Sequence, residues 1–513
     1  MTEVLIVGAG PVGLSCAIDL LRRGVTCRII EKSPAFAVGT RARGISARTQ
    51  EIFESWGLLD SLRQHAEPRL PTVFYDRTGE IKSESAVAAP TTPTPDIPYP
   101  NALMVSQQNT DAVLRAKLRE LGGTVEIATA FTSISQNPDF ITASVNGEGR
   151  NELIQAQYLI GCDGGRGAVR NSLGIPYRSG SWEDQTSYLL GNLDVEGLDP
   201  DRWHVWTDNG WGYVTLQPII HGHTWLFVAT VPPTDATRFS SPSIADFETL
   251  YRDRLPCSTI SFENLTWHSF YRRSLRIVSR YRMNRAFLAG DAAHLGVEHG
   301  MNVGIQEVHN LGWKLAAVLK RNAPDQLLDT YHEEREPVAC AILEASLARD
   351  LGKAGPAQAA GTLTKAILNQ DPTKDPTQLS VCYPDSRLSR DWVTAKLAAG
   401  QRAPDVFGLR RADGQMLRLF DLIGGAKFIL LAFGSPGKIP SEPWYDAYRI
   451  VKAEGPGSGP KTLVDVDSQA HRIFGVSGEL NILIRPDGHL AGSAEAAQLD
   501  RQLTHVRRLV SGA

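Results

Sequence analysis

The chain has 513 residues, 42% of them hydrophobic and 21% charged, a composition typical of folded globular proteins rather than disordered or fibrous ones. Its length exceeds that of one average domain, so we expect a large unit with a smaller one appended. Acidic residues outnumber basic ones by 56 to 53, which excludes the basic surface of a nucleic-acid-binding protein and gives no attraction to an anionic membrane. We therefore expect neither nucleic acid nor membrane as a partner.

The cysteines and the apolar runs indicate where in the cell the protein is located. Six cysteines are scattered without a CxxC pair or metal-ligand spacing, which indicates reduced thiols and no metal site. The first apolar run, residues 4–7, is too short for a signal-peptide core, and no uncharged run of about 18 residues follows it. A cytoplasmic location is the resulting expectation.

The hydrophobic pattern divides the chain into units. Residues 1–180 alternate short β-branched runs with helical periodicity, as in a doubly wound α/β domain, and this pattern returns over 281–350. Alternating aromatic-rich segments over 181–280 predict an antiparallel sheet, to which we add part of 70–105. An Ala-, Gly- and Pro-rich stretch predicts a linker over 351–395. Residues 396–513 then form a small α/β domain.

A glycine-rich turn stands at the start of the chain. Residues 4–7 predict a buried strand that runs into Gly8-Ala9-Gly10-Pro11-Val12-Gly13, followed by apolar residues at helical spacing. In this pattern Gly8 permits the tight turn, Gly10 lets the backbone approach a pyrophosphate, and Gly13 lets helix and strand pack closely. The helix N-terminus then offers free N–H groups to phosphate.

An acidic residue follows at the spacing that this turn requires. A second predicted strand, residues 27–30, ends at Glu31, roughly 20 residues after the glycines, where a carboxylate can accept hydrogen bonds from a ribose. Strand, turn, helix, strand and acid in register predict a dinucleotide site. Whether the ligand is FAD or NAD stays open at this point.

Two later segments resemble motifs of a known family. Residues 158–170 (Tyr-Leu-Ile-Gly-Cys-Asp-Gly-Gly-Arg-Gly-Ala-Val-Arg) resemble the Asp-Gly motif of single-component flavin aromatic hydroxylases, and residues 285–294 (Arg-Ala-Phe-Leu-Ala-Gly-Asp-Ala-Ala-His) resemble their Gly-Asp motif. With residues 41–53, Gln107 and residues 300–306, the likeness spans nearly the whole chain. The sequence thus resembles monooxygenases of the para-hydroxybenzoate hydroxylase fold, in particular phenol-hydroxylase and polyketide-tailoring members with a thioredoxin-like C-terminal domain.

The resemblance implies a function. FAD would be the cofactor, NADPH or NADH a transient co-substrate, and a phenolic or polycyclic aromatic would be hydroxylated with O2 in secondary metabolism, by a monomer or a homodimer. Two alternatives stay open. One is a hydroxylase-fold flavoenzyme that has lost oxygen activation and catalyses dehydrogenation, cyclisation or dehydration; the other is a non-catalytic FAD- or ligand-binding protein.

The resemblance also assigns cofactor contacts. Asp291 can accept hydrogen bonds from ribityl hydroxyls, and the helix that opens near Met301 can direct its positive end at the flavin. Asp163 either serves the cofactor or only caps a helix. The predicted cofactor-binding residues are Gly8, Gly10, Pro11, Val12, Gly13, Glu31, Lys32, Arg41, Arg48, Gln107, Asp163, Gly290, Asp291, Gly300, Met301 and Asn302. No catalytic residue and no metal ligand is assigned.

Two features depart from the family. His294 is followed only by Leu295-Gly296-Val297-Glu298-His299 before Gly300, a shorter loop that lacks the family's proline and paired glycines. Because this loop resembles the one beside the flavin face where oxygen reacts, we expect greater access of water there. Glu298 and His299 are either acid–base groups near the flavin or solvent-facing residues. The C-terminal domain contains no cysteine, which excludes dithiol chemistry in it.

Overall fold

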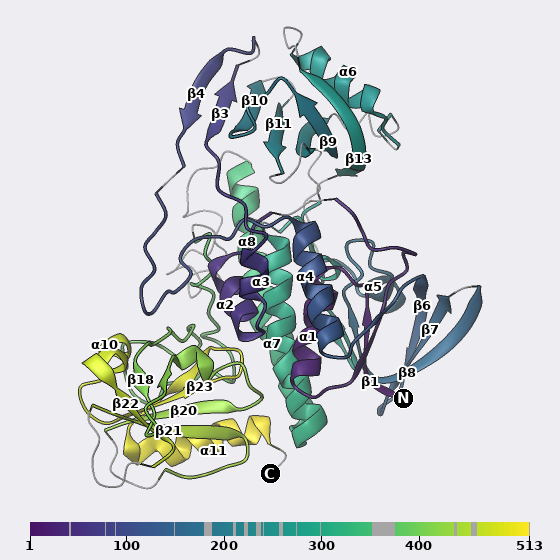
Figure 1. The fold of residues 1–513 in the computed structure, drawn as a ribbon. Helices are drawn as coiled ribbons and strands as arrows, with labels where there is room; N and C mark the ends of the chain where they lie inside the picture. Colours follow the sequence, from purple (N-terminus) through teal and green to yellow (C-terminus); the bar gives the residue numbers. More distant parts are fainter. Residues whose placement is uncertain are drawn as a thin grey trace.

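The protein is described from a computed structural model, which Figure 1 shows as a central body, an upper sheet and a C-terminal domain. The structure describes residues 1–39, 43–76, 78–87, 89–147, 149–178, 187–208, 212–219, 224–231, 238–239, 241–255, 260–272, 274–297, 299–350, 375–434, 439–452 and 459–511. No helix in these ranges combines the length and the apolar character needed to cross a membrane.

The central body is built on an eight-stranded sheet of order β15-β16-β8-β1-β2-β5, with β7 and β6 added beyond β8. The strands β2, β1, β8 and β16 run parallel. Residues 4–7 are buried in a hydrophobic core that they share with Leu14, Ile18 and Leu311. The strands are β1 (Thr2–Val7), β2 (Cys27–Ile30), β5 (Val125–Glu126), β6 (Thr129–Gln136), β7 (Ile141–Gly147), β8 (Arg150–Gly161), β15 (Arg282–Met283) and β16 (Ala286–Leu288).

Helices α1 and α7 pack against each other in the middle of the central body (Figure 1). Their close approach depends on Gly312, because a Cβ there would lie 2.0 Å from Oδ2 of Asp19. The helices of this body are α1 (Pro11–Arg22), α2 (Ala47–Ser55), α3 (Leu59–Arg63), α4 (Gln107–Glu120), α5 (Ala168–Ser172), α7 (Gly300–Arg321) and α8 (Thr330–Asp350).

The upper sheet has seven strands in the order β13-β9-β12-β11-β10-β3-β4. Its aromatic residues mostly fill the interior between the sheet and helix α6 (Ile244–Arg254): Phe227 packs on Phe247 with ring centroids 5.1 Å apart, and Trp206 on Tyr251 at 5.6 Å. The strands are β3 (Thr72–Tyr75), β4 (Ile81–Ser85), β9 (Ser187–Glu196), β10 (Trp203–Asp208), β11 (Gly212–Pro218), β12 (Thr224–Val231) and β13 (Ser261–Arg272). The expected α/β architecture with an interleaved sheet is confirmed; strands β9 to β13 pair antiparallel as expected, whereas β3 pairs parallel with β10.

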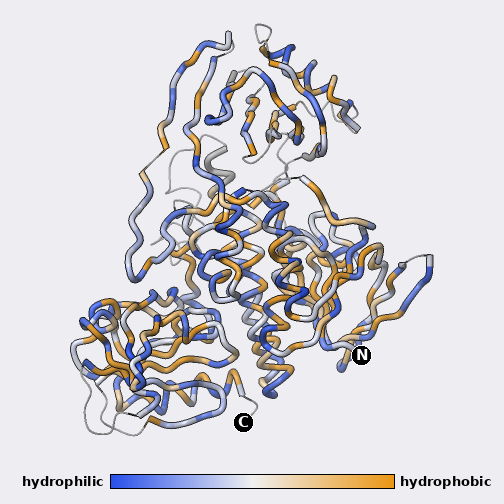
Figure 2. The backbone as a smooth tube through the Cα atoms, viewed as in Figure 1, coloured by the Kyte–Doolittle hydropathy of each residue, from blue (hydrophilic) through white to orange (hydrophobic). Residues whose placement is uncertain are grey.

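The C-terminal domain, residues 396–511, contains a mixed seven-stranded sheet of order β19-β18-β22-β21-β20-β23-β24. Strand β20 is parallel to β21 and antiparallel to β23. Figure 2 shows hydrophobic residues gathered in these strands and in the middle of the central body. The elements are β18 (Leu409–Arg410), β19 (Met416–Leu417), β20 (Phe428–Phe433), β21 (Tyr445–Val451), β22 (Thr462–Asp465), α10 (Gln469–Phe474), β23 (Leu480–Ile484), β24 (Leu490–Ala494) and α11 (Leu499–Val510).

The predicted linker is not a free connection over the part that the structure describes. In residues 375–395, Leu388 is fully buried and packs with Trp313 of α7 and with the C-terminal domain. Gln378 accepts a hydrogen bond from Gln306 Nε2 at 2.7 Å, and the Arg390 N–H donates to the Ala491 carbonyl at 2.8 Å. This segment therefore joins the two units, a role that its Pro- and Gly-rich composition did not indicate.

Candidate functional site

The glycine-rich turn between β1 and α1 contains three glycines, and each position favours glycine for a different reason. Gly8 has a positive φ of +102°, and a Cβ at Gly13 would lie 1.9 Å from the Gly8 carbonyl oxygen. The fold itself therefore requires both. A Cβ at Gly10 would meet no heavy atom of the described residues within 4 Å. The bare backbone of Gly10 faces open space, which suits the approach of a pyrophosphate.

Glu31 closes this turn from the end of β2. One carboxylate oxygen accepts a hydrogen bond from the Ala9 N–H at 3.0 Å and the other from the Ser33 N–H at 2.9 Å. Each oxygen can accept a further hydrogen bond, so Glu31 can hold a ribose as well. Lys32, beside it, is exposed.

Val12 brings the glycine-rich turn and the Gly-Asp motif together. A Cβ at Gly290 would lie 3.0 Å from a Val12 methyl group, and a Cβ at Gly304 would lie 2.6 Å from it. The Val12 side chain thus packs against two glycines that are far away in sequence. Only its backbone, beside Pro11 at the start of α1, can face a ligand.

Asp163 of the Asp-Gly motif combines the two roles that the sequence left open. Its Oδ2 accepts a hydrogen bond from the Val169 N–H at 2.9 Å and so caps α5. Its Oδ1 is buried and has no hydrogen-bond partner among the described residues. Burial raises the pKa of Asp163. An unpaired buried oxygen is the feature expected where a bound molecule supplies the missing donor.

A buried glutamate of α7, Glu307, is hydrogen-bonded to two residues of the Gly-Asp motif. Glu307 accepts a hydrogen bond from the Gly290 N–H at 2.8 Å, and its other oxygen lies 2.9 Å from Nε2 of His294. Burial opposes the imidazolium, but the Glu307 carboxylate outweighs it and raises the pKa of His294. The sequence analysis missed Glu307. Its position on α7, seven residues after Gly300 and on the same helix face as Gly304, could have indicated that it faces the Gly-Asp motif.

Asp291 and the start of α7 lie together. The Asp291 side chain is exposed, and a Cβ at Gly300 would lie 3.6 Å from its Oδ1. Helix α7 begins after His299, a left-handed residue with φ of 58° whose side chain makes no capping hydrogen bond. The first N–H groups of α7, from Gly300 and Met301 onward, have no partner within their own helix, and negative charge on a ligand is favoured there.

The side chain of Asn302 has a structural role in addition to the predicted one of its helix N-terminus. Its Oδ1 accepts a hydrogen bond from the Ser46 N–H and its Nδ2 donates to the Gly44 carbonyl, both at 2.9 Å. The side chain therefore ties the segment before α2 to the first turn of α7. Its backbone N–H still belongs to the open helix N-terminus.

The predicted flavin contact of Arg48 is not supported. Its guanidinium donates to Glu51 Oε2 at 2.8 Å and to the Asp487 carbonyl at 2.6 Å. Arg48 thus joins α2 to the C-terminal domain, because the helix turns its side chain toward that neighbour. Arg41 lies outside the described residues. Gln107, the first residue of α4, hydrogen-bonds to Asp111 one turn later, and burial raises the pKa of Asp111 to about 7.

The shortened loop is partly a strand. β17 (His294–Leu295) pairs with β14 (Arg276–Ile277), and Val297 is buried against Leu275 and α7 and α8. Leu295 covers the Asp-Gly motif, since a Cβ at Gly165 would lie 2.5 Å from it. His299 is exposed, in line with a solvent-facing residue, and Glu298 lies outside the described residues.

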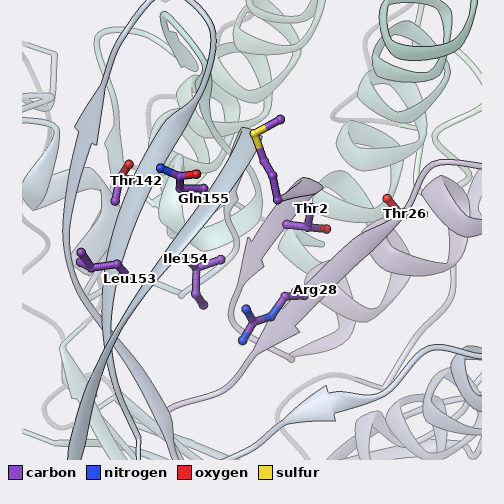
Figure 3. Close-up of a pocket in the computed structure, with 8 residues that line it drawn as sticks. Thr2, Thr26, Arg28, Thr142, Leu153, Ile154 and Gln155 are labelled. Atoms are coloured by element: carbon purple, nitrogen blue, oxygen red, sulfur yellow. The ribbon is translucent and has the colours of Figure 1, made fainter.

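A surface hollow elsewhere is unrelated to this site. Its volume is about 610 Å³, and it lies at the N-terminal end of β1, opposite to the end that carries Gly8 (Figure 3). Arg28 in its wall is paired with Glu126 and Glu152. The described residues hold no cluster of potential metal ligands.

Comparison with known proteins decides the family. The FAD binding domain family matches residues 1–346. The chain is 33% identical over 505 residues to a flavin-dependent monooxygenase of Mycobacteroides abscessus, covering 96% of this chain and 98% of that protein. The chain belongs to the FAD-dependent monooxygenases of the aromatic-hydroxylase type. It is thus an oxidoreductase that uses FAD, and the choice between FAD and NAD for the glycine-rich turn is settled.

Two further monooxygenase relatives cover almost the whole chain. The 6-methylpretetramide 4-monooxygenase of Streptomyces rimosus is 31% identical over 543 residues, covering 96% of this chain and 91% of that protein. The crystal structure of aklavinone-11 hydroxylase with FAD and aklavinone superimposes with a TM-score of 0.74 at 25% identity and 99% coverage of both chains. The residues of this site suit FAD: Gly10 faces open space, Asp163 Oδ1 is unpaired among the described residues, and the His299 side chain does not cap the start of α7.

Proposed function

We propose that this monooxygenase hydroxylates a phenolic or polycyclic aromatic substrate of the polyketide type, with NADPH or NADH and O2. The observation that carries the proposal is that the segment before α2 contacts both the start of α7 and the upper sheet. Gly44 is bound to Asn302 of α7, and the neighbouring Arg43 donates to the Pro218 carbonyl of β11 at 2.9 Å. The upper sheet is thereby fixed next to the start of α7, as a substrate-binding wall must be. The substrates named for the two relatives, 6-methylpretetramide and aklavinone, support the polyketide class.

In the proposed site the pyrophosphate of FAD binds at the N-terminus of α1, where the turn from Gly8 to Gly13 offers backbone N–H groups. Glu31 receives the adenosine ribose, and Asp291 accepts hydrogen bonds from the ribityl chain. Bound FAD supplies hydride acceptance and oxygen activation. Arg41, Gln107 and Lys32 stay predicted contacts.

The chain's own contribution to catalysis is electrostatic and steric. The positive end of α7 stabilises negative charge on a neighbouring flavin ring system. Leu295 and Val297 exclude water on the side of the shortened loop, which protects reactive species from side reactions. The Glu307–His294 pair holds the turn that carries Asp291.

A second candidate function is suggested by the shortened loop, residues 295–299. Because the loop lacks the family's proline and paired glycines, the fold can alternatively serve a redox-neutral cyclisation or dehydration. The two candidates differ in the fate of oxygen and of reducing equivalents.

Oxygen labelling separates the two candidates. Holoenzyme is incubated with aklavinone as probe, NADPH or NADH, and ¹⁸O₂, and the product is examined by mass spectrometry. We expect one labelled oxygen atom per product and consumption of the nicotinamide. Product that forms without nicotinamide and without label would instead establish the redox-neutral reaction. Reactions lacking the nicotinamide serve as the control.

We also propose a thioredoxin-like fold without dithiol chemistry for residues 396–513, a cytoplasmic location and a homodimeric state. The mixed sheet around β20 supports the first, and five free cysteines among the described residues agree with a reducing compartment. Sedimentation analysis of the holoenzyme tests the homodimer.

A further inference from the structure

A cluster of unpaired polar atoms lies where the central body meets the upper sheet. Arg43 Nε and Nη1, Glu67 Oε1 and Trp203 Nε1 are all buried without a hydrogen-bond partner among the described residues. The side chains belong together: Arg43 forms an ion pair with Glu67, and its guanidinium carbon lies 5.9 Å from the centre of the Trp203 ring. Because proteins leave few buried polar groups unpaired, four at one place indicate a partner from outside the chain.

The three residues are held firmly. The Arg43 side chain is 7% exposed and that of Glu67 1%. The backbone N–H of Glu67 donates to the Met104 carbonyl at 2.7 Å, and that of Trp203 to the Pro71 carbonyl at 2.8 Å. The remaining Arg43 nitrogen, Nη2, is used by Glu67 and by the Pro218 carbonyl. The positions of these residues are therefore fixed by the fold, and their open hydrogen-bonding groups indicate the chemistry of a partner.

The open groups define that chemistry. Arg43 and Trp203 offer N–H donors, whereas Glu67 offers one acceptor. The Arg43–Glu67 pair carries no net charge, so an anionic group such as a carboxylate or phosphate would meet the Glu67 oxygen unfavourably. A neutral carbonyl oxygen can accept from two of the three open N–H groups, and an adjacent hydroxyl can accept from the third while it donates to Glu67.

We propose that Arg43, Glu67 and Trp203 form a recognition site for a hydroxyl group adjacent to a carbonyl group on the aromatic substrate. The carbonyl oxygen accepts from Arg43 and Trp203, and the hydroxyl donates to Glu67. This inference rests on the proposed aromatic substrate. Arg43 precedes Gly44, which is bound to Asn302 at the start of α7, so recognition of this pair of groups orients the ring system with respect to the flavin side of the pocket.

Binding to the oxidised holoenzyme tests the site without any need for turnover. Three probes are titrated while the flavin absorbance is followed: 2-acetyl-1-naphthol, which carries both groups, 1-naphthol, and 2-acetylnaphthalene. We expect 2-acetyl-1-naphthol to bind most tightly. Trp203→Phe, which removes only the indole N–H donor, should weaken its binding about tenfold, and Arg43→Lys at least as much. Binding of 1-naphthol should change less than about twofold in Trp203→Phe.

Trp444→Phe is the matched control, since its indole nitrogen is also buried without a partner among the described residues but lies in the C-terminal domain. It should leave all three dissociation constants unchanged. Equal affinities for the three probes, or equal losses for all probes in Trp203→Phe, would overturn the proposal and leave the cluster as a site for ordered water only. The flavin spectrum and thermal unfolding of each variant check that it is folded. Selective probe binding without ¹⁸O incorporation would refute the proposed monooxygenation while supporting this site.

Discussion

Arg485 of the C-terminal domain and Glu334 of α8 form a two-point ion pair, with Nη1 2.7 Å from Oε1 and Nη2 2.8 Å from Oε2. Lys314 Nζ lies 2.7 Å from Glu334, and Asp487 pairs with Arg485, so two cations balance two anions in the interior. All four side chains are essentially buried. Separation of the C-terminal domain would expose or unbalance these charges, which makes the domain a structural part of the enzyme.

Removal of one partner should therefore be costly. Arg485→Met leaves Glu334 and Asp487 with only Lys314 to balance them, and we expect the free energy of unfolding to fall by about 3–5 kcal/mol in denaturant titrations. The control is Arg387→Met, which breaks the partly exposed pair with Glu333 and should cost less than about 1 kcal/mol. Equal losses in the two variants would contradict a special role for the buried pair.

The glycine-rich turn gives a contrast between two substitutions. Gly10→Val places a side chain in space that only a ligand would use, so FAD affinity should be lost while the apoprotein remains as stable as the unsubstituted one. Gly13→Ala brings a Cβ against the Gly8 carbonyl and should lower the stability of the apoprotein as well. Fluorescence titration with FAD and thermal unfolding of the apoproteins measure both effects. A yellow Gly10→Val protein would show that this backbone does not meet the pyrophosphate.

Two of the predicted carboxylate ligands of FAD, Asp291 and Asp163, can be tested by substitution. Asp291→Ala should weaken FAD binding by about 1–3 kcal/mol because ribityl hydroxyls lose an acceptor. Asp163→Asn keeps one oxygen for the Val169 N–H and changes the other position into a donor. If Asp163 only caps α5, FAD affinity in Asp163→Asn stays unchanged; a loss of affinity assigns its second oxygen to the cofactor.

Asp111 should make stability depend on pH. Burial raises its pKa to about 7, so the folded state keeps the proton while the unfolded chain releases it near pH 4. Stability is then fully present below about pH 4 and declines as pH rises to about 7. Asp111→Asn removes this decline, and its gain in unfolding free energy should be larger at pH 7.5 than at pH 5, by on the order of 2 kcal/mol. Parallel pH profiles for Asp111→Asn and the unsubstituted protein would contradict this; Glu120→Gln, at the exposed end of α4, is the control.

Val297 should limit the loss of reducing equivalents as hydrogen peroxide. Its side chain belongs to the shortened loop and is buried against α7 and α8. Val297→Ser should therefore admit water and raise the amount of hydrogen peroxide formed per NAD(P)H oxidised. Val338→Ala, which thins the same hydrophobic cluster from α8, should leave that ratio nearly unchanged. Complete coupling in the unsubstituted protein would show that the shorter loop does not open the flavin side to water. High uncoupling would instead show that the shortened loop admits water, as its length alone suggested, and that Leu295 and Val297 do not exclude it.

The sequence alone determined the cofactor class and the α/β fold, because their signals are local. Gly8 and Gly13 are required by backbone geometry within a few residues of the chain, and Glu31 follows one strand later. Such constraints leave a spacing that can be read without knowledge of distant contacts. The Asp-Gly and Gly-Asp motifs are short segments of the same kind, and the chain's likeness to FAD-dependent monooxygenases confirmed what they indicated.

Only the tertiary structure decided what individual side chains do. Arg48 faces Asp487, which is 439 residues away, and the Asn302 side chain binds the segment before α2. Arg43, Glu67 and Trp203 come from three separate parts of the chain and share no spacing or periodicity. A side chain's partner across such distances depends on how whole elements pack, and packing leaves no pattern along the sequence beyond the burial of apolar residues.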